Sequence, residues 1–272
     1  MTTRHLLLIA GLALAVLAAG CVTGPQANTT TAPTASPVPD GTGTPPAVAG
    51  TTTSLTAGGR EYPAYLAVPA GSGPHPAIVL VHSFNGLEPG YRTLCDEIAA
   101  DGFAVIAPEW QTYGRQAGDD EVEALLRSAV AFLGNRSDID DGRIGLTGFC
   151  AGGRYTMLFL PQMPEFGAGV AWYGFPYSGG AANGTRPVDL VADLERPMLI
   201  IHGSRDEASN LTEIYNYTLE LDRAGRYFEL AVYQGKPHGF MVQNGTLARD
   251  DVAEDASAEM ISFFRRMLGQ PR

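Results

Sequence analysis

Apolar runs and amphipathic segments alternate along most of this chain. The runs rich in apolar, β-branched and aromatic residues cover positions 62–68, 77–82, 103–107, 143–147, 168–173, 197–202 and 227–233. Between and after them, segments with apolar residues at a spacing of three to four, which is typical of helices, cover positions 91–101, 120–134, 151–160, 210–224 and 250–268. Residues 77–81 are apolar on both faces, as a parallel strand covered by helices must be. The pattern therefore predicts an α/β fold in a single domain, with a mostly parallel, doubly wound sheet and helices on both faces.

The first twenty residues have a different pattern. Arg4 precedes an uninterrupted apolar run at 6–19, which has about the length of a signal-peptide core and is too short to span a bilayer convincingly. The run ends in Leu-Ala-Ala-Gly before Cys21, which resembles the lipobox at which lipoproteins are cleaved before a cysteine that then carries lipid. We predict a signal peptide at 1–20 and lipid attachment at Cys21, hence an extracytoplasmic protein. A plain secretory peptide and an uncleaved anchor are the alternatives.

The next segment, residues 21–53, consists mainly of Thr, Pro, Ala, Gly and Ser, with almost no charge and no apolar periodicity. Such a composition cannot bury enough surface to offset the entropy lost on ordering. It is typical of the extended stalks that hold extracytoplasmic domains away from a membrane. We predict a disordered tether at 21–53 and a folded domain at 54–272.

Composition and charge restrict the partners of this chain. It has 272 residues, 45% of them hydrophobic, so it can build a sizeable core. Its 18 basic residues against 29 acidic ones give a formal charge of −11, without long runs of either sign. A nucleic-acid-binding protein needs a basic footprint, so we expect no nucleic-acid partner. The oligomeric state cannot be read from the sequence.

The three cysteines, Cys21, Cys95 and Cys150, cannot all be paired, and they show no CxxC or Cys/His pattern. A disulfide framework and a structural metal site are therefore both disfavoured. Cys95 falls among apolar residues of a helical segment and is predicted to be a small core residue.

Cys150 stands in a sequence that is typical of a nucleophile elbow. The segment Gly-Phe-Cys-Ala-Gly joins the strand-like run ending at Thr147 to the helical segment starting at Ala151. Flanking glycines permit the sharp turn that exposes a nucleophile above the sheet, and a helix N-terminus stabilises a thiolate. We predict that Cys150 is a catalytic nucleophile; the alternative is a buried, unreactive cysteine at a tight turn.

A general base and an acid follow in the chain order that this type of elbow requires, namely nucleophile, acid, histidine. His238 lies in a loop after the last strand-like run, and Asp206 lies in the loop after the run at 197–202. Asp206 would orient the imidazole, with Glu207 as the alternative if the register differs by one residue. Asp206 could instead cap a helix, and His238 could be a turn residue that packs on Phe240.

Acyl transfer also needs hydrogen-bond donors for the oxyanion. The backbone N–H groups of Ala151, directly after the nucleophile, and Phe84, in the loop after the run at 77–82, are the expected donors. His82 and His202 lie at the ends of strand-like runs, where a supporting role is expected rather than general-base catalysis.

Taken together, residues 62–268 resemble the dienelactone hydrolase family of the α/β-hydrolase fold. The resemblance rests on Gly-Phe-Cys-Ala-Gly-Gly around Cys150, Gly-Ser-Arg-Asp ending in Asp206, and Pro-His-Gly-Phe around His238. It implies a cofactor-free Cys-His-Asp hydrolase that opens an enol-lactone through an acyl-enzyme, with arginines holding a substrate carboxylate. Arg115 matches the arginine-bearing loop of the family and is a candidate substrate contact, or else an ordinary surface arginine.

Two residues depart from the pattern of that family. Ser83 stands where a glutamate hydrogen-bonds the resting thiol, so Ser83 is also a candidate substrate-site residue, and Val242 stands where a second arginine is expected. We therefore expect a small-molecule ester or lactone hydrolase that favours neutral substrates. An acyltransferase or thioesterase with the same triad, and a catalytically idle cell-surface binding protein, are the alternatives.

Overall fold

The computed structural model describes residues 48–269. The chain divides into two units, Met1–Gly43 and Thr44–Arg272, and all described residues belong to the second unit. The predicted signal peptide at 1–20, the predicted lipid attachment at Cys21 and most of the predicted tether lie outside the described residues.

An eight-stranded sheet forms the centre of the second unit, with the strand order β1-β2-β4-β3-β5-β6-β7-β8. The strands are β1 (Thr51–Ala57), β2 (Arg60–Ala67), β3 (His75–Val81), β4 (Ala104–Pro108), β5 (Ile139–Phe149), β6 (Phe166–Trp172), β7 (Met198–Gly203) and β8 (Phe228–Tyr233). β2 is antiparallel to both β1 and β4, and every other pair in the sheet is parallel. The predicted mostly parallel α/β architecture is confirmed.

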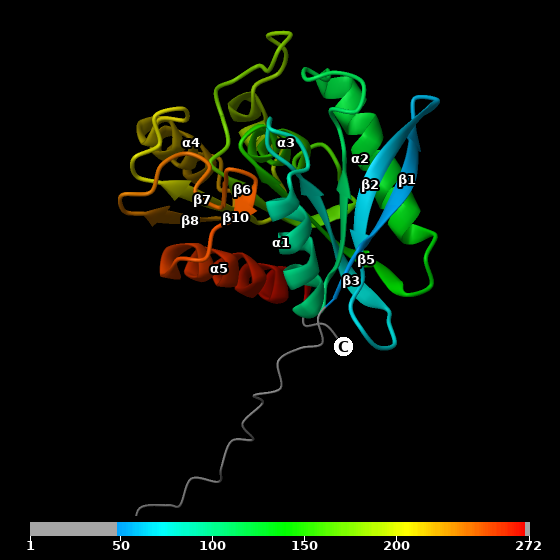
Figure 1. The fold of residues 1–272 in the computed structure, drawn as a ribbon. Helices are drawn as coiled ribbons and strands as arrows, with labels where there is room; N and C mark the ends of the chain where they lie inside the picture. Colours follow the sequence, from blue (N-terminus) through cyan, green and yellow to red (C-terminus); the bar gives the residue numbers. More distant parts are fainter. Residues whose placement is uncertain (1–47, 270–272) are drawn as a thin grey trace, which may run out of the picture. The chain divides into compact units, whose positions relative to one another are not determined.

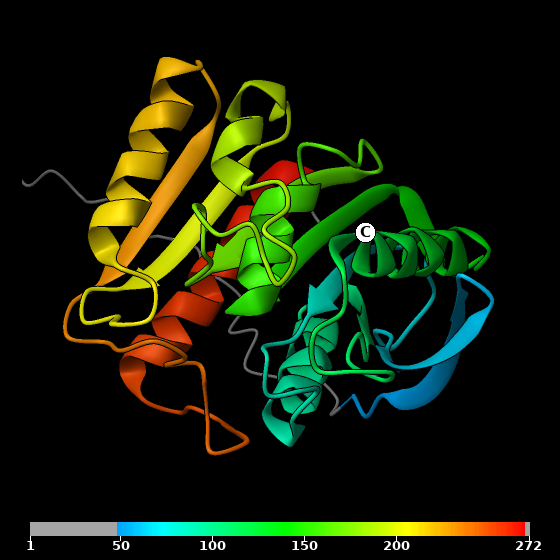
Figure 2. The same cartoon turned by 90° about the horizontal axis from the view of Figure 1, so that it is seen from above.

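Helices cover both faces of this sheet (Figures 1 and 2). They are α1 (Pro89–Ala100), α2 (Asp119–Gly134), α3 (Ala151–Phe159), α4 (Leu211–Arg223) and α5 (Asp251–Leu268). α1 and α5 share one apolar core with one face of the sheet, whereas α2, α3 and α4 share a second core with the other face. A 3-10 helix (Pro187–Asp193) and a short hairpin of β9 (Val242–Gln243) and β10 (Thr246–Leu247) complete the described part. None of the helices within residues 48–269 is long and apolar enough to cross a membrane.

The burial of the central strands explains why their sequences lack alternation. All residues of β3 and of β4 are buried, because each strand has a parallel or antiparallel neighbour on both sides and helices above and below. A strand in this position gains stability from apolar side chains on both faces, about 25 cal/mol for each Å² of apolar surface removed from water. The uniformly apolar run at 77–81 follows from this position.

The N-terminal boundary of the domain is a correction to the sequence analysis. β1 begins at Thr51, so the residues 51–53 that were assigned to the tether are part of the sheet. β1 is rich in threonine, and only Leu55 and Ala57 in it are buried. Its stability comes from the register with β2, which extends from the pair Thr51 and Leu66 to the end of the strand.

Candidate active site

The predicted catalytic residues lie at one edge of the sheet. Cys150 follows β5, Asp206 follows β7 and His238 follows β8, and these three strands run parallel. The loop that contains Phe84 follows β3, which is parallel to β5. Since the carboxyl ends of parallel strands share one edge, loops from distant parts of the sequence meet there.

Cys150 occupies a strained turn between β5 and α3. Its backbone angles are φ 59° and ψ −113°, a region that residues other than glycine rarely adopt and that costs about 1–3 kcal/mol. Its N–H donates to the carbonyl oxygen of Trp172 at 3.0 Å, and its carbonyl accepts from the N–H of Arg154 at 3.0 Å. These bonds, together with the strand before and the helix after, stabilise the turn.

Two flanking glycines are required by close backbone contacts at this turn. A Cβ atom at Gly152 would lie 2.0 Å from the carbonyl oxygen of Val81, and one at Gly148 would lie 2.1 Å from that of Gly152. Both distances are far shorter than a van der Waals contact, so neither position accepts a side chain. The glycines of the predicted elbow therefore let the first turn of α3 pack directly against β3 and β5.

Asp206 and His238 are in direct contact. Nδ1 of His238 lies 2.8 Å from Oδ2 of Asp206. The other carboxylate oxygen, Oδ1, accepts from the N–H groups of Ala208 at 2.9 Å and Ser209 at 2.7 Å. The Asp206 side chain is completely buried, whereas the neighbouring Glu207 is exposed. The carboxylate that orients the imidazole in this structure is therefore that of Asp206.

Backbone contacts hold the loops of Asp206 and His238 together. The N–H of Ser204 donates to the carbonyl of Tyr233 at 3.0 Å, and the N–H of Arg205 donates to that of Lys236 at 2.9 Å. A Cβ atom at Gly203 would lie only 2.3 Å from the carbonyl oxygen of Lys236. The distance between the side chains of Asp206 and His238 is thus set by backbone pairing as well as by the side chains themselves.

His238 has a pKa raised from its ordinary value to about 9. Burial of the ring by itself lowers this pKa, but the hydrogen bond that Nδ1–H donates to Asp206 and the interaction with the Cys150 sulfur raise it by more. Nδ1 is taken by Asp206, so Nε2 is the ring nitrogen that remains for the sulfur; it is buried and has no hydrogen-bond partner among the described residues. The rings of Tyr173 and Phe175 pack on the imidazole, with centroid distances of 5.0 and 5.5 Å.

The two expected oxyanion donors both line the same cavity as Cys150. Ala151 is the first residue of α3, and the first N–H groups of a helix have no partner within the helix. Phe84 belongs to a loop in which the N–H of Asn85 donates to Oγ of Ser83 at 3.1 Å and the N–H of Gly86 donates to the Ser83 carbonyl at 3.2 Å. These short-range bonds give the loop a defined backbone conformation.

The histidines at the strand ends are buried, and burial lowers the pKa of both. Burial lowers the pKa of His82 to about 4, and its ring stacks on Trp110 at a centroid distance of 5.2 Å. Burial also lowers the pKa of His202, whose Nε2–H donates to the carbonyl of Ser209 at 2.9 Å. Neither ring lines the cavity, in keeping with the expected supporting role.

The cavity at Cys150 has a volume of about 470 Å³. Aromatic rings contribute most of its apolar wall, those of Phe84, Trp110, Tyr155 and Phe175. Gln116, Ala117, Ser178, Gly180, Ala181 and Ala208 line it as well, together with Cys150, Ala151, Arg115, Arg154 and His238. The sequence analysis missed the roles of the aromatic residues and of Arg154, because their positions in loops and on a buried helix face carry no motif.

Of the two candidate substrate residues, Arg115 lines the cavity and Ser83 does not. Arg115 lines the cavity, is exposed, and stacks on Phe84 with its guanidinium carbon 4.7 Å from the ring centroid. No carboxylate within residues 48–269 pairs with it. Ser83, in contrast, is buried and does not line the cavity, and Val242 packs against the apolar core of α1 and α5. In this structure Ser83 supports the loop of Phe84 through its hydroxyl and its carbonyl group.

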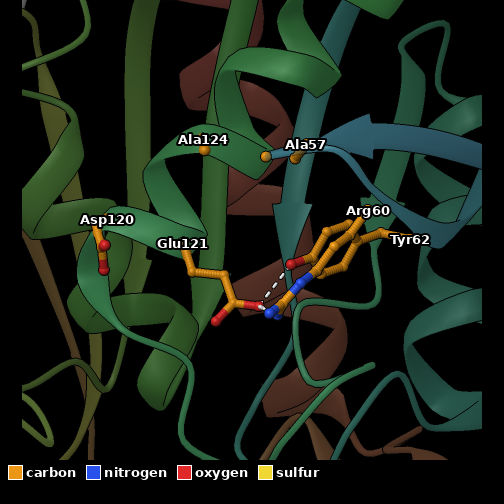
Figure 3. A pocket seen from close by; sticks show the side chains of 7 residues that line it. Ala57, Arg60, Tyr62, Asp120, Glu121 and Ala124 are labelled. Carbon is orange, nitrogen blue, oxygen red and sulfur yellow. Dashed lines mark hydrogen bonds and ion pairs between the residues drawn. The ribbon is translucent and has the colours of Figure 1, made fainter.

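A second hollow, of about 310 Å³, lies between the β1–β2 hairpin and α2 (Figure 3). In it the hydroxyl of Tyr62 donates to Glu121 at 2.6 Å, and Arg60 lies 3.7 Å from the same carboxylate. Its lining includes none of the predicted catalytic residues. Among the residues that the structure describes, no group of three or more His, Cys, Asp or Glu side chains could hold a metal ion.

Comparisons with known proteins place most of this chain in one family. The model of the dienelactone hydrolase family matches residues 62–268. A protein of Methylorubrum extorquens named "Putative carboxymethylenebutenolidase" is 32% identical over 224 residues, which cover 75% of this chain and 76% of that protein. A protein of the same name in Escherichia coli K12 is 30% identical over 80% of this chain and 87% of its own length.

Solved structures show the same fold. The structure titled "Putative Dienelactone Hydrolase" from Klebsiella pneumoniae is 27% identical and has a TM-score of 0.74, with coverage of 81% of this chain and 99% of that one. An acylaminoacyl peptidase of Pyrococcus horikoshii is 18% identical with a TM-score of 0.69, and the match covers 83% of this chain but only 43% of that one. This second similarity shows the fold alone.

Proposed function

Because the chain belongs to the dienelactone hydrolase family and is a hydrolase of lactones or esters, we propose that it cleaves its substrate through a covalent acyl-enzyme on Cys150, with His238 and Asp206 as its triad partners. The observation that carries the proposal is the contact of 2.8 Å between His238 and the buried Asp206 at the edge of the sheet where Cys150 lies. A raised pKa of His238 near the Cys150 sulfur supports it further, because an imidazolium stabilises a thiolate.

The steps follow from these groups. The Cys150 thiolate attacks the carbonyl carbon, a C–S bond forms, and the carbonyl electron pair moves to oxygen, where the N–H groups of Ala151 and Phe84 stabilise the charge. Collapse of this intermediate breaks the C–O bond of the ester, and Nε2 of His238 protonates the departing alkoxide. Water then attacks the thioester, His238 accepts its proton, and the carboxylic acid leaves as Cys150 is regenerated. In a lactone the alkoxide and the acyl group belong to one molecule, so a single hydroxy acid is released.

The substrate class follows from the lining of the cavity. Aromatic rings surround the nucleophile, and the one cation that lacks a carboxylate partner in the described lining is Arg115. A substrate carboxylate needs paired, charge-assisted donors, each worth about 1.5–3 kcal/mol. With Val242 where a second arginine was expected, the proposed substrates are neutral, largely apolar esters or lactones.

We further propose an extracytoplasmic location, with attachment to a membrane through lipid on Cys21. The support is the sequence alone: an apolar run followed by small residues and a cysteine, and then a Thr/Pro-rich segment. One lipid chain holds a protein only reversibly, at about 0.8 kcal/mol for each buried CH₂ group, so two chains are expected.

The proposed reaction is tested with a panel of p-nitrophenyl esters and small lactones. We expect hydrolysis of short neutral esters, together with labelling of Cys150 by iodoacetamide that depends on His238. A different result would be labelling of Cys150 while no ester or lactone of the panel is turned over, either in water or with added alcohol and thiol acceptors. This result would identify the chain as an idle binding protein. Faster transfer to an added acceptor than to water would identify an acyltransferase instead.

A further inference from the structure

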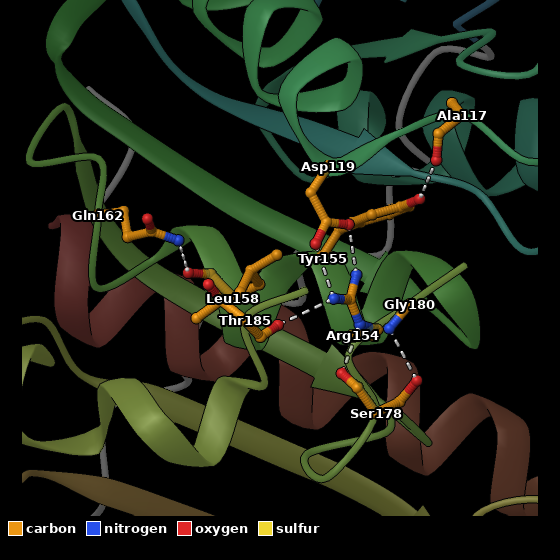
Figure 4. A network of polar contacts seen from close by, with 9 residues as sticks. All are labelled: Ala117, Asp119, Arg154, Tyr155, Leu158, Gln162, Ser178, Gly180 and Thr185. Atoms are coloured by element: carbon orange, nitrogen blue, oxygen red, sulfur yellow. Dashed lines mark hydrogen bonds and ion pairs between the residues drawn. The ribbon is translucent and has the colours of Figure 1, made fainter. Parts of the chain in front are cut away.

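Arg154 is a charged residue on an otherwise apolar helix. It lies on α3, one turn after Cys150, and only 4% of its surface is exposed. Its guanidinium makes a two-pronged ion pair with Asp119 at the start of α2, with Nη1–Oδ1 at 2.7 Å and Nη2–Oδ2 at 2.8 Å (Figure 4). A buried arginine is stable only when its donors are paired, so this contact accounts for the charge but not for the position of the residue beside the cavity.

The remaining donors of Arg154 bind one segment of chain, residues 175–185. Nε donates to the carbonyl of Ser178 at 2.8 Å, and Nη2 also donates to the carbonyl of Thr185 at 3.1 Å (Figure 4). At Gly180 a Cβ atom would lie 3.0 Å from the guanidinium carbon, and the backbone there has φ +69°, so a glycine lets this segment lie directly on the arginine. The guanidinium thus connects α3, α2 and both halves of the segment.

Phe175 packs on the ring of His238 and Tyr177 packs against the core, whereas residues 178–185 have few attachments besides Arg154 among the described residues. Residues 181–186 are exposed, and the N–H of Gly184 donates to the carbonyl of Gly179, inside the segment itself. Outside it, the N–H of Val188 donates to the carbonyl of Pro176 at 3.0 Å. The contacts with Arg154 are therefore a large share of what determines where residues 178–185 lie.

The same segment forms one wall of the cavity at the nucleophile. Phe175, Ser178, Gly180 and Ala181 all line that cavity, as does Arg154 itself. Because the charge of Arg154 is balanced by Asp119, its guanidinium does not offer an anion site in the way that the unpaired Arg115 does.

We propose that Arg154, through its ion pair with Asp119, is a positioning residue that holds segment 175–185 as the wall of the cavity and so determines which sizes of acyl group the enzyme accepts. The inference rests on the proposed hydrolysis at Cys150, and it adds a determinant of specificity outside the triad. We call the contacts of Arg154 with Asp119, Ser178 and Thr185 the clasp. Binding of an acyl group long enough to touch the wall depends on the clasp, whereas an acetyl group is too short to touch it.

The test removes the charge of the more exposed partner, because an Arg154 substitution in the core could prevent folding. Asp119→Asn keeps the shape of the side chain, and Asp120→Asn is the matched control with the same charge change in the same helical turn. We expect Asp119→Asn to raise the KM for p-nitrophenyl hexanoate at least about fivefold, in line with the cost of lost apolar contacts. The KM for p-nitrophenyl acetate should change less than about twofold. Asp119→Glu, which keeps the carboxylate, should have a KM for the hexanoate close to that of the wild type. An equal loss for both esters, or no loss for either, would overturn the proposal.

A second measurement does not depend on turnover. Hydrogen exchange of the backbone of residues 175–185 should be at least about tenfold faster in Asp119→Asn than in the wild type and in Asp120→Asn. The protein is alkylated and then digested, and the extent of reaction is read from the peptide that contains Cys150. Asp119→Asn should change the rate of alkylation by N-phenylmaleimide more than the rate of alkylation by iodoacetamide. Unchanged exchange in this segment would refute the clasp even if hydrolysis is normal. Absence of hydrolysis by the wild type, with exchange as expected, would refute the proposed function and leave the clasp standing.

Discussion

Nδ1 of His238 and Oδ2 of Asp206 lie 2.8 Å apart at the carboxyl ends of the neighbouring strands β7 and β8. The second oxygen of Asp206 is held by the N–H groups of Ala208 and Ser209, so the carboxylate cannot rotate away from the imidazole. The orientation of the proposed base is therefore determined by backbone groups. Substitutions of His238 or Asp206 should change the ionisation of the site more than they change the fold.

Cys150→Ala should abolish turnover. Removal of the nucleophile of a triad typically lowers the rate by about 10⁴- to 10⁶-fold, and the turn at Cys150 has room for a smaller side chain. Steady-state hydrolysis of a p-nitrophenyl ester measures the loss, and circular dichroism shows whether the fold is retained.

Cys95→Ala is the matched control. Cys95 is completely buried in α1, and burial raises the pKa of its thiol, so it is an unreactive core residue. This variant should keep its activity. Activity of Cys150→Ala close to that of the wild type would exclude Cys150 as the nucleophile.

Asp206→Asn should lower the pKa of His238. Burial lowers this pKa, whereas the interactions with Asp206 and Cys150 raise it to about 9. Without the carboxylate one of the raising interactions is lost, so the lowering effect of burial is less well offset. NMR titration of the His238 ring protons measures the change. Glu207→Gln, an exposed neighbour with the same charge change, should leave the titration in place. An identical pKa in wild type and Asp206→Asn would contradict the assignment of the acid.

The stability that His238 contributes should depend on pH. Its pKa in the folded protein lies above the ordinary value of 6.5, so the folded state binds the proton more tightly and is stabilised by it at low pH. This contribution is complete below about pH 6.5 and is lost as the pH rises through about 9. The difference in free energy of unfolding between wild type and His238→Gln should shrink over that window in urea titrations. Parallel pH curves of the two proteins would show that the imidazolium is not stabilised by the fold.

Neutral esters should be preferred over matched anionic ones. Arg115 is exposed and already stacks on Phe84, and no second arginine lines the described cavity except Arg154, which Asp119 neutralises. We expect the neutral member of an ester pair to have the higher kcat/KM by about tenfold, which is the cost of one missing charge-assisted bond. A strong preference for the anionic ester that disappears in Arg115→Ala would instead reveal a functional carboxylate site.

Lipid attachment at Cys21 should control partitioning. Full-length protein with Cys21→Ser should be released from membranes or stall in processing, whereas the wild type should sediment with them. Mass spectrometry of the mature N-terminus identifies the modification. Equal partitioning of both proteins would leave an uncleaved anchor as the explanation.

The local order of residues was sufficient to predict much of this fold. Helix periodicity at 120–134 and 151–160 corresponds to α2 and α3, because amphipathic spacing and helix formation are both properties of neighbouring residues. The glycines around Cys150 indicated a sharp turn for the same reason. β1 was missed, since its threonines resemble those of the preceding tether and its stability comes from pairing with β2.

Other features depend on chain segments that no local pattern relates. The choice of Asp206 over Glu207 follows from the backbone pairing of two loops that lie about thirty residues apart in the sequence. The roles of Arg154 and of segment 175–185 are also invisible locally, because the arginine binds a carboxylate on α2 and two carbonyl groups of a segment that lies more than twenty residues further along the chain. Sequence patterns therefore indicated which residue types carry the chemistry, whereas long-range backbone packing determined which side chains meet and which wall encloses the cavity, because those contacts exist only after the sheet has brought the loops together.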